Sequence, residues 1–288
     1  MANTLVNKVL RDKYRKATLE VALRNSLVAE KICEVDRSDS YTIQAPYLTA
    51  PSTTVQAYVG TYSPAAVTTN TDTLTVADEV IVATHIFGFE NIISKFDLFA
   101  AFTEEQSYAV AKAIDKFVLN VVLEAGTGTY TTPVGGFTTA SNINVIMSNL
   151  ISQVAGYADT YKGLFLVIEN TDVPGFIQAQ ATNGFSFADA ALNNGFMSSY
   201  MGVDIYVVRS STFEDDTQTS DSGSQTWSNS GHRLFGVKGV STYAAPRGLQ
   251  FEEKGVTGKT GMEIVTYGLI GAKVWTPKAA LIVDITLA

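Results

Sequence analysis

The chain has 288 residues, of which 46% are hydrophobic, so it can bury a substantial core in one large domain or in two closely joined ones. Its single cysteine, Cys33, excludes an intramolecular disulfide and any metal site built from several cysteines, and it favours a reducing cytoplasm. The sequence has no uninterrupted apolar run of about eighteen residues and no signal-peptide pattern after Met1. We therefore expect a soluble protein that is neither secreted nor inserted in a membrane.

The net charge of -8 is unevenly distributed along the chain. Residues 1–37 hold eight Lys or Arg against five Asp or Glu, which leaves +3 on this segment and -11 on the remainder. The basic side chains that could lie against nucleic acid or an acidic partner are Lys8, Arg11, Lys13, Arg15 and Lys16. A solvated helix face would explain the same pattern equally well. The acidic remainder would be repelled by a phosphate backbone.

The first third of the chain changes character at Ser38. Apolar residues recur at helical spacing over residues 4–35, without Gly or Pro, and predict one or two helices. Residues 38–86 are rich in Thr, Val, Ser, Tyr and Ala, with three prolines, and predict strand and loop.

Two β-prone runs within that region, Thr53–Tyr62 and Asp72–Thr84, flank a turn-rich segment and predict a long hairpin. Each arm would reach about 30 Å, yet the tip has too few large aliphatic residues to form a core of its own. The hairpin therefore packs on its own subunit or, as we favour, on a neighbouring one.

Two helices follow. Thr103–Gln106 has the pattern of a capping box, and an apolar stripe from Val110 to Val121 predicts a helix of about 22 residues that ends before Gly126. A second apolar stripe, from Ile143 to Val154, predicts a helix from Ser141 to Gly156. Both stripes indicate packing against a core.

Strands and helices alternate in the second half. Leu164–Glu169 is a continuous apolar run typical of a buried strand, and residues 172–180 predict a short helix with Pro174 in its first turn. Val203–Val208 predicts another strand, while Thr212–Gly231 is polar, without periodicity, and is expected to be an exposed loop. The chain closes with β-prone runs near 233–243, 248–254, 261–268 and 279–287.

Recognisable catalytic patterns are missing. His85 and His232 are the only histidines, and neither stands in a catalytic pattern, so both are interpreted as structural or surface residues. Gly258-Lys259-Thr260 resembles the end of a phosphate-binding loop, but Glu253 stands where the first glycine is required, so a turn between strands is favoured.

Two further patterns also fail as sites. The segment around Ser241 lacks the last glycine of a nucleophile elbow. Asp215, Asp216 and Asp221 do not have the spacing of a calcium loop and are interpreted as a solvated cluster. We therefore expect no enzyme, and no cofactor, metal or catalytic residue.

The order of these features resembles the tailed-bacteriophage major capsid proteins, whose fold is shared with encapsulins. The likeness is carried by the N-terminal arm, the hairpin with its return strand Asp78–Phe87, and the long helix after Thr103. The segments Leu164–Gln180 and Gly195–Val208, and the ending from Tyr267 to Val283, are also similar to that family.

The resemblance implies an α+β capsid fold in five parts. These are an N-terminal arm at 1–51, an extended hairpin loop at 52–86, a peripheral domain with a long spine helix at 87–140, an axial domain of mixed sheet flanked by helices at 141–248, and closing strands at 249–288. It also implies pentamers and hexamers that tile an icosahedral shell around double-stranded DNA in a virion assembled in the host bacterial cytoplasm. A scaffolding protein, a portal and a decoration protein would be partners.

Contacts between subunits would then involve the hairpin and the arm. Tyr58, Val59 and Tyr62 are the candidate hairpin anchors, since aromatic side chains give much contact area at little entropic cost. The five basic arm residues would face the lumen or the scaffold. The alternatives are an encapsulin-type compartment, a β-rich tail-tube or surface protein, and an unrecognised enzyme.

Overall fold

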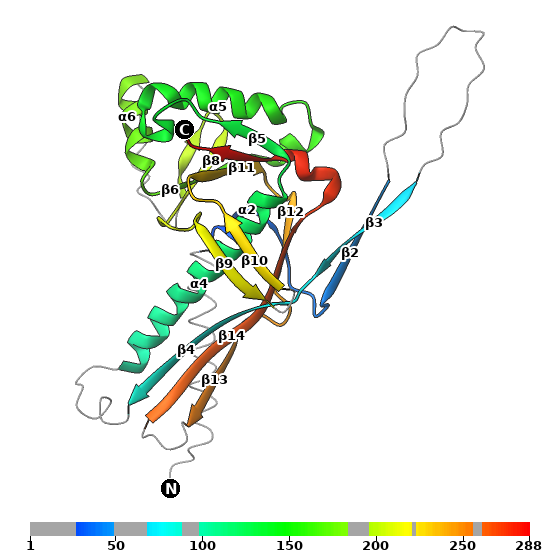
Figure 1. Cartoon of the computed structure of the whole chain (residues 1–288), viewed down its shortest axis with the longest axis vertical. Helices are drawn as coiled ribbons and strands as arrows, with labels where there is room; N and C mark the ends of the chain where they lie inside the picture. The colour runs from blue at the N-terminus through cyan, green and yellow to red at the C-terminus, as the bar shows by residue number, and fades with distance from the viewer. Residues whose placement is uncertain (1–26, 49–67, 88–97, 184–195, 221–222, 256–260) are drawn as a thin grey trace.

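The computed structural model describes residues 27–48, 68–87, 98–183, 196–220, 223–255 and 261–288. Figure 1 shows an elongated molecule with a compact body at one end, a long sheet and helix at the other, and a two-stranded ribbon that projects from the side. Below, these parts are called the six-stranded body, the long sheet and the ribbon.

The six-stranded body is built on a mixed sheet in the order β5-β15-β11-β6-β8-β7. Its strands are β5 (Gly128–Thr131), β6 (Leu164–Glu169), β7 (Phe196–Tyr200), β8 (Val203–Val208), β11 (His232–Val237) and β15 (Ile282–Thr286). The pairs β15–β5 and β6–β8 are parallel, and the other pairs are antiparallel. All six positions of β6 are buried, as its unbroken apolar sequence predicts for a central strand.

Helices cover both sides of this sheet (Figure 1). α5 (Ala140–Val154) and α6 (Val173–Asn183) pack together over one side, and the C-terminal end of α4 (Leu98–Ala125) reaches the other. Short helices η1 (Gly136–Thr138), η2 (Ala158–Lys162) and η3 (Thr276–Leu281) connect the elements. The apolar stripe predicted for the α5 segment is buried in the core, which confirms that helix to within two residues at its ends.

The long sheet runs away from the body alongside α4. Its central strand is β14 (Gly261–Val274), which pairs with β4 (Asp78–Phe87), β13 (Gln250–Gly255) and β12 (Ser241–Ala244). β1 (Glu34–Asp36) adds to β12 in parallel after the four-residue helix α2 (Ala29–Ile32). The strands on either side of the turn predicted near Gly258 pair antiparallel up to Gly255 and Met262, while residues 256–260 themselves lie outside the described residues.

The predicted pairing of Thr53–Tyr62 with Asp72–Thr84 is wrong. The ribbon is formed by β2 (Thr42–Leu48) and β3 (Thr69–Thr75), and residues 78–84 pair with β14 instead. The ribbon ends after Thr75. Val76 and Val80, which follow, are buried, and their burial favours a path of the chain along the long sheet.

Three other boundaries differ from expectation. α4 begins at Leu98, so the predicted capping box lies inside the helix, where Gln106 is buried and donates to Thr84 Oγ1 at 2.9 Å and to the carbonyl of Ile264 at 3.2 Å. The expected helix over residues 4–35 does not reach its predicted end, because β1 starts at Glu34. The expected loop at 212–231 contains the hairpin of β9 (Asp215–Ser220) and β10 (Gly223–Ser228), stabilised by Trp227, which is buried against Phe117 of α4.

Candidate functional site

The described residues include the thiol of Cys33 and the imidazole of His232, and neither belongs to a cluster that could hold a metal ion. No three His, Cys, Asp or Glu side chains of the described residues could hold a metal ion together. Burial raises the pKa of the Cys33 thiol to about 12, so the thiol stays protonated and is a poor nucleophile. His232 is held by Asp284 at 2.7 Å. The features described next are the projecting ribbon, the side chains that fix it and the N-terminal segment to the fold, and the exposed apolar side chains.

The ribbon is the first of these features. Figure 1 shows that β2 and β3 leave the molecule together and extend beyond the body. None of the seven residues of β2 is buried, and Leu48 at its outer end is 66% exposed. In β3 only Asp72 and Leu74, near the foot, are buried. Because a two-stranded ribbon with so little buried surface is marginally stable in water, we expect its outer end to gain stability from contact with another surface.

A clamp at Asp72 attaches the ribbon to the C-terminal end of β14 in the long sheet and to η3. The Asp72 carboxylate pairs with Lys273 of β14 and accepts hydrogen bonds from the backbone N–H and the hydroxyl of Thr276, at 2.9 and 2.8 Å. Burial raises the pKa of Asp72, but the hydrogen bonds from Lys273 and Thr276 outweigh this effect and lower the pKa to about 2. Lys273 also donates to the Thr73 carbonyl at 2.6 Å. The ribbon therefore leaves the body in a fixed direction.

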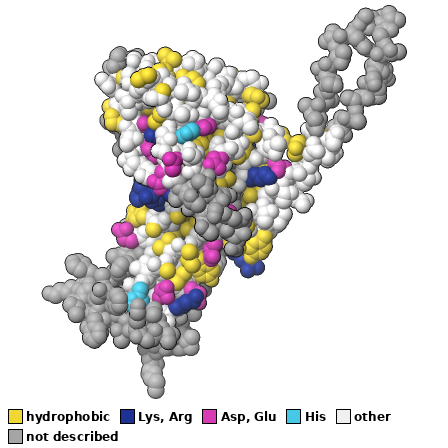
Figure 2. Space-filling view, in the orientation of Figure 1, with side chains coloured by type: hydrophobic (Ala, Val, Ile, Leu, Met, Phe, Trp, Pro, Cys, Tyr) yellow, Lys and Arg dark blue, Asp and Glu magenta, His cyan; other side chains and the backbone are white. Residues whose placement is uncertain are grey.

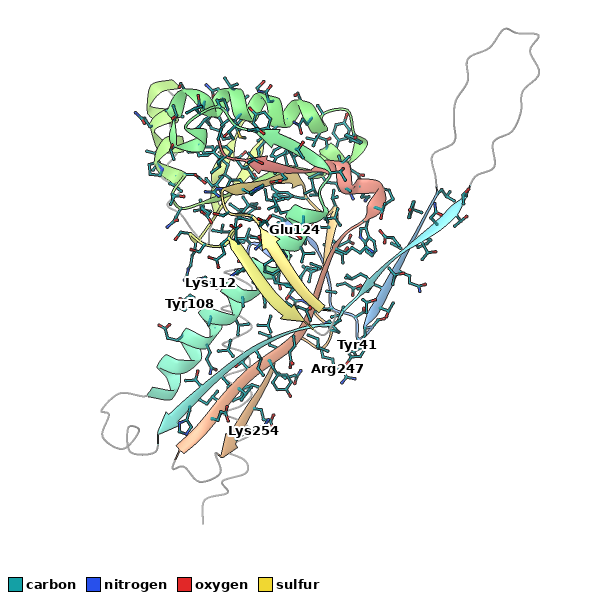
Figure 3. All side chains as sticks on the ribbon, viewed as in Figure 1. Tyr41, Tyr108, Lys112, Glu124, Arg247 and Lys254 are labelled. Atoms are coloured by element: carbon teal, nitrogen blue, oxygen red, sulfur yellow. The ribbon has the colours of Figure 1, made fainter. Side chains whose placement is uncertain are left out.

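Tyr41 lies at the foot of the ribbon, close to where it leaves the long sheet (Figure 3). Its carbonyl accepts a hydrogen bond from the N–H of Val76 at 2.9 Å, which extends the β2–β3 ladder by one contact beyond Thr42 and Thr75. The tyrosine side chain is 44% exposed. The foot thus combines fixed backbone with an aromatic side chain that neighbouring protein can contact.

A second carboxylate, Asp115 in α4, holds the N-terminal part of the described chain. Its two oxygens accept the backbone N–H groups of Val28 and Ala29 at 3.2 and 2.9 Å, so α4 supplies the cap for the short helix α2. Burial raises the pKa of Asp115, whereas the two N–H donors and the charge of Lys31 lower it. The effect of burial prevails, and the pKa is about 7. A titratable side chain of α4 therefore contributes to holding α2 in place, together with the burial of Leu27 and Ile32.

Polar contacts also join the β9–β10 hairpin to α4. Asn120 is fully buried, donates to the Thr212 carbonyl at 2.9 Å and accepts from Asn229 Nδ2 at 2.8 Å. Lys116 pairs with Glu214 at 2.5 Å at the edge of this contact. These contacts fix the hairpin beside the helix, and Figure 1 shows both strands running at a large angle to α4.

A buried charge network stabilises one end of the six-stranded body. Arg233, which is 4% exposed, pairs with Asp172 at 2.5 Å and with Glu169 at 3.2 Å. Asp172 precedes α6, and Glu169 ends β6, so the network joins the end of a strand to the start of a helix. Because each charge has a partner, we interpret the network as structural.

Large apolar side chains are exposed on several parts of the molecule. Those on the six-stranded body are Val134, Val145, Tyr157, Tyr161, Ile177 and Met201, and those elsewhere are Tyr41, Leu48, Ile81 and Tyr108. Figure 3 shows Tyr108 and Lys112 on the side of α4 that faces away from the long sheet. Figure 2 shows apolar groups in small areas between charges of both signs on the face it displays. This distribution favours several modest contacts over one large interface.

The residues predicted as contacts are not placed by the structure. Tyr58, Val59 and Tyr62 lie outside the described residues, as do Lys8, Arg11, Lys13, Arg15 and Lys16. The structure instead identifies Asp72 and Asp115 as the side chains that fix the ribbon and α2, and sequence reasoning missed both. Their partners lie up to 204 and 87 residues away along the chain, so no local pattern could have identified them.

In the described part of the chain, no helix has the length and apolar character needed to span a membrane. No family model and no curated protein matches the sequence. Solved structures do match. One is a capsid structure of the cyanophage P-SCSP1u, which is 14% identical in sequence and superposes with a TM-score of 0.67. The match covers 91% of this chain and 88% of the cyanophage chain.

A structure from Mycobacterium phage Che8 is 16% identical in sequence, with a TM-score of 0.65. The match covers 87% of this chain and 88% of the phage chain. This protein has the tailed-phage major capsid fold. A virus-like particle from Pyrococcus furiosus shares the capsid fold at 9% identity and a TM-score of 0.61, over 96% of this chain and 99% of its own.

Proposed function

We propose that this chain is the major capsid protein of a tailed bacteriophage, a shell subunit that forms pentamers and hexamers around double-stranded DNA. The observation that carries the proposal is the capsid fold over about nine-tenths of the chain, with phage capsid structures of nearly the same length. The six-stranded body would be the axial domain, and the long sheet with α4 the peripheral domain.

The ribbon and the arm are the parts that would join subunits. The ribbon has no buried face in β2, and it leaves the body in a direction fixed by Asp72. In a shell it would lie across a neighbour, where apolar burial and strand contacts stabilise it. Specific interfaces bury about 800 Å² per partner, and several such contacts per subunit add up in a closed shell.

The remaining partners follow from the same proposal. A scaffolding protein, a portal and a decoration protein would contact the shell, and the basic residues from Lys8 to Lys16 would face the scaffold or the packaged DNA. Assembly would take place in the host bacterial cytoplasm, and the finished protein would reside in the virion. The role would be structural and not catalytic.

The test uses the predicted anchors. The double variant Tyr58→Asp/Tyr62→Asp should keep the circular dichroism spectrum of the wild type but form no shells in negative-stain micrographs of the purified chain. The matched control, Tyr58→Phe/Tyr62→Phe, keeps the aromatic rings and should assemble as the wild type does. Normal shells from the aspartate variant would discard these anchors, and a wild-type chain that never forms closed particles, even with its scaffold, would overturn the proposal.

The second candidate is an encapsulin-type compartment. It is favoured by the match to the Pyrococcus furiosus particle, which covers more of both chains than the two phage structures do. Nuclease-protected double-stranded DNA inside particles made during infection would support the phage capsid, while protein cargo without DNA would support the compartment. Since the structures named above are capsids and particles, they favour a shell over a tail tube, which would form rods.

A further inference from the structure

Two turns of the molecule hold a large side chain in a backbone conformation that its residue type disfavours. Met201 has a φ of 52° and Arg247 a φ of 61°, in the left-handed region where the Cβ atom of an L-residue crowds the following carbonyl. Glycine and asparagine adopt this region more readily, and both side chains are exposed. Folding alone favours another residue at each position, so a contact made after folding would explain why these two are present.

Met201 occupies the tip of the β7–β8 hairpin. Tyr200 pairs with Val203 across the ladder, so Met201 and Gly202 form a two-residue turn in which both φ angles are positive. This is the pattern of a type I′ turn, for which Asn-Gly is a preferred sequence. Tyr200 and Val203 are buried, and the Tyr200 hydroxyl donates to Asn144 of α5, so the base of the turn is fixed to the six-stranded body. The turn thus presents a 53% exposed methionine on a fixed base.

Arg247 occupies a turn between β12 and β13. The N–H of Gly248 donates to the carbonyl of Ala245 at 3.2 Å, and Pro246 and Arg247 stand between them. Proline second and a positive φ third is the pattern of a type II turn, whose third position favours glycine or asparagine. Gln250 Nε2 also donates to the Arg247 carbonyl at 3.0 Å. The backbone that carries the arginine side chain is therefore fixed.

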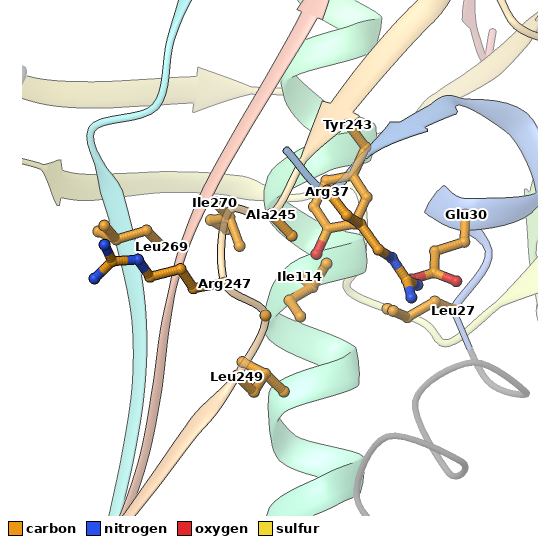
Figure 4. Close-up of a pocket in the computed structure, with 11 residues that line it drawn as sticks. Leu27, Glu30, Arg37, Ile114, Tyr243, Ala245, Arg247, Leu249, Leu269 and Ile270 are labelled. Carbon is orange, nitrogen blue, oxygen red and sulfur yellow. The ribbon is translucent and has the colours of Figure 1, made fainter. Parts of the chain in front are cut away.

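The Arg247 guanidinium makes no ion pair with another described residue. Figure 4 shows it directed away from Tyr243, on the opposite side of that ring from Glu30, whose carboxylate pairs with Arg37 at 2.8 Å. Figure 3 shows Arg247 near the foot of the ribbon, the element proposed to lie across a neighbour. Because the chain outside residues 1–37 carries a net charge of -11, the surface of a second copy offers this arginine mainly carboxylates.

We propose that Met201 and Arg247 are contact residues between copies of this chain. The inference rests on the proposed shell function and names two of its contacts. Met201 packs on apolar side chains of a second copy, whose six-stranded body exposes Val134, Val145 and Ile177. Arg247 pairs with a carboxylate of a second copy through its planar guanidinium. Since each residue meets a different surface on the neighbour, both contacts are head-to-tail, as in a closed ring of subunits.

The test replaces each residue by asparagine in the full-length chain. Met201→Asn and Arg247→Asn remove the contact and relieve the backbone, so each variant should unfold at the urea concentration of the wild type or at a higher one. Each should nevertheless raise the critical concentration for assembly at least about tenfold, measured by light scattering in the same assembly mixture as the wild type. The difference between Arg247→Asn and the wild type should narrow as salt is added, because salt screens an ion pair.

Two matched variants separate the contacts from backbone strain and from net charge. Ser211→Asn changes the remaining described residue other than glycine with a positive φ, 68°, and should leave the critical concentration at its wild-type value. Lys254→Asn removes one positive charge from a surface pair with Glu252 and should shift that concentration by less than about twofold. An effect of either control as large as that of the main variants would overturn the proposal.

The main variants can also refute it. A lower urea midpoint would show that Met201 or Arg247 stabilises the lone subunit, and an unchanged critical concentration would show that the residue touches no neighbour. Either result overturns the proposal for that residue while the wild type still assembles, and so leaves the shell function standing. A wild-type chain that never self-associates would overturn both.

Discussion

The six-stranded body and the ribbon are both made of strands, yet they are stabilised in different ways. Each position of β6 is buried, with strands on both sides and helices over the sheet, whereas no position of β2 is buried. Stability in the body comes from its own core. The ribbon is held at its foot by the Asp72 clamp and by a small apolar cluster of Leu74, Val76 and Ala244, whereas its outer end has no buried residue. We therefore expect the outer end to gain stability from a neighbouring protein surface, which the body does not need.

The largest expected effect is a cavity in the body. Phe165→Ala removes a fully buried ring from β6 and should lower the free energy of unfolding by about 3–5 kcal/mol. Tyr47→Ala in the ribbon should lower it by less than about 1 kcal/mol, since the residue packs on little. Urea denaturation followed by circular dichroism measures both. Equal losses would contradict the contrast between the two regions.

The arm attachment should give stability a pH dependence. The pKa of Asp115 is raised from 3.8 to about 7 in the folded chain, so the folded state binds a proton more tightly than the unfolded state does. The free energy of unfolding should therefore fall as the pH rises from about 4 to about 7, by up to about 1.4 kcal/mol per pH unit. Denaturation of the wild type and of Asp115→Asn at several pH values checks this. The variant should lose the slope, and a retained slope would assign it to another group.

The ribbon clamp should show the opposite sign. The pKa of Asp72 is lowered from 3.8 to about 2, so its stabilisation is fully present above pH 4 and is lost as the pH falls toward 2. Asp72→Asn should cost about 2 kcal/mol at pH 7 and flatten the pH dependence between 2 and 4. Asp159→Asn, which breaks long, partly exposed pairs with Lys162 and Lys278, is the control and should change little. A similar loss in the control would argue against a specific clamp.

The smallest effect on folding should come from the exposed end of the ribbon. Leu48→Ser should change the free energy of unfolding by less than about 0.5 kcal/mol, because the side chain is 66% exposed. If the ribbon lies on a neighbour, the same variant should reduce the yield of shells counted in micrographs. Thr69→Ser, at the residue opposite Leu48 in the ladder, is the matched control. Wild-type yield from Leu48→Ser would show that Leu48 contacts no partner in the shell.

Much of the body could be predicted from sequence because its signals are local. The apolar run of β6, the stripe of α5 and the proline in the first turn of α6 each depend on neighbours along the chain. The order of such elements was sufficient to predict the capsid fold. The same local signals failed at Thr103, because α4 continues past the capping pattern and uses Gln106 for a contact with the long sheet.

The candidate surfaces could not be predicted in the same way. Pairing of Thr42–Leu48 with Thr69–Thr75 depends on where β4 finds its partner in β14, which is distant in sequence. The polar strands β9 and β10 lack an apolar alternation, and Trp227 with Asn229 fixes them to α4. The roles of Asp72 and Asp115 arise only after folding brings distant backbone groups to their carboxylates.

The length of β14 has a mechanical consequence. Its fourteen residues extend for about 45 Å, and the strand passes without a break from partners β4 and β13 to partner β12. Residues 262–267 pair with β4 on one edge and with β13 on the other, so bending this part of the strand would break ladder hydrogen bonds on both edges. This part of the strand is therefore stiff, and a tilt imposed at one end of it is transmitted to the other. A subunit that had to fit rings of different curvature would adjust at its ribbon and arm while this part of the strand stayed straight.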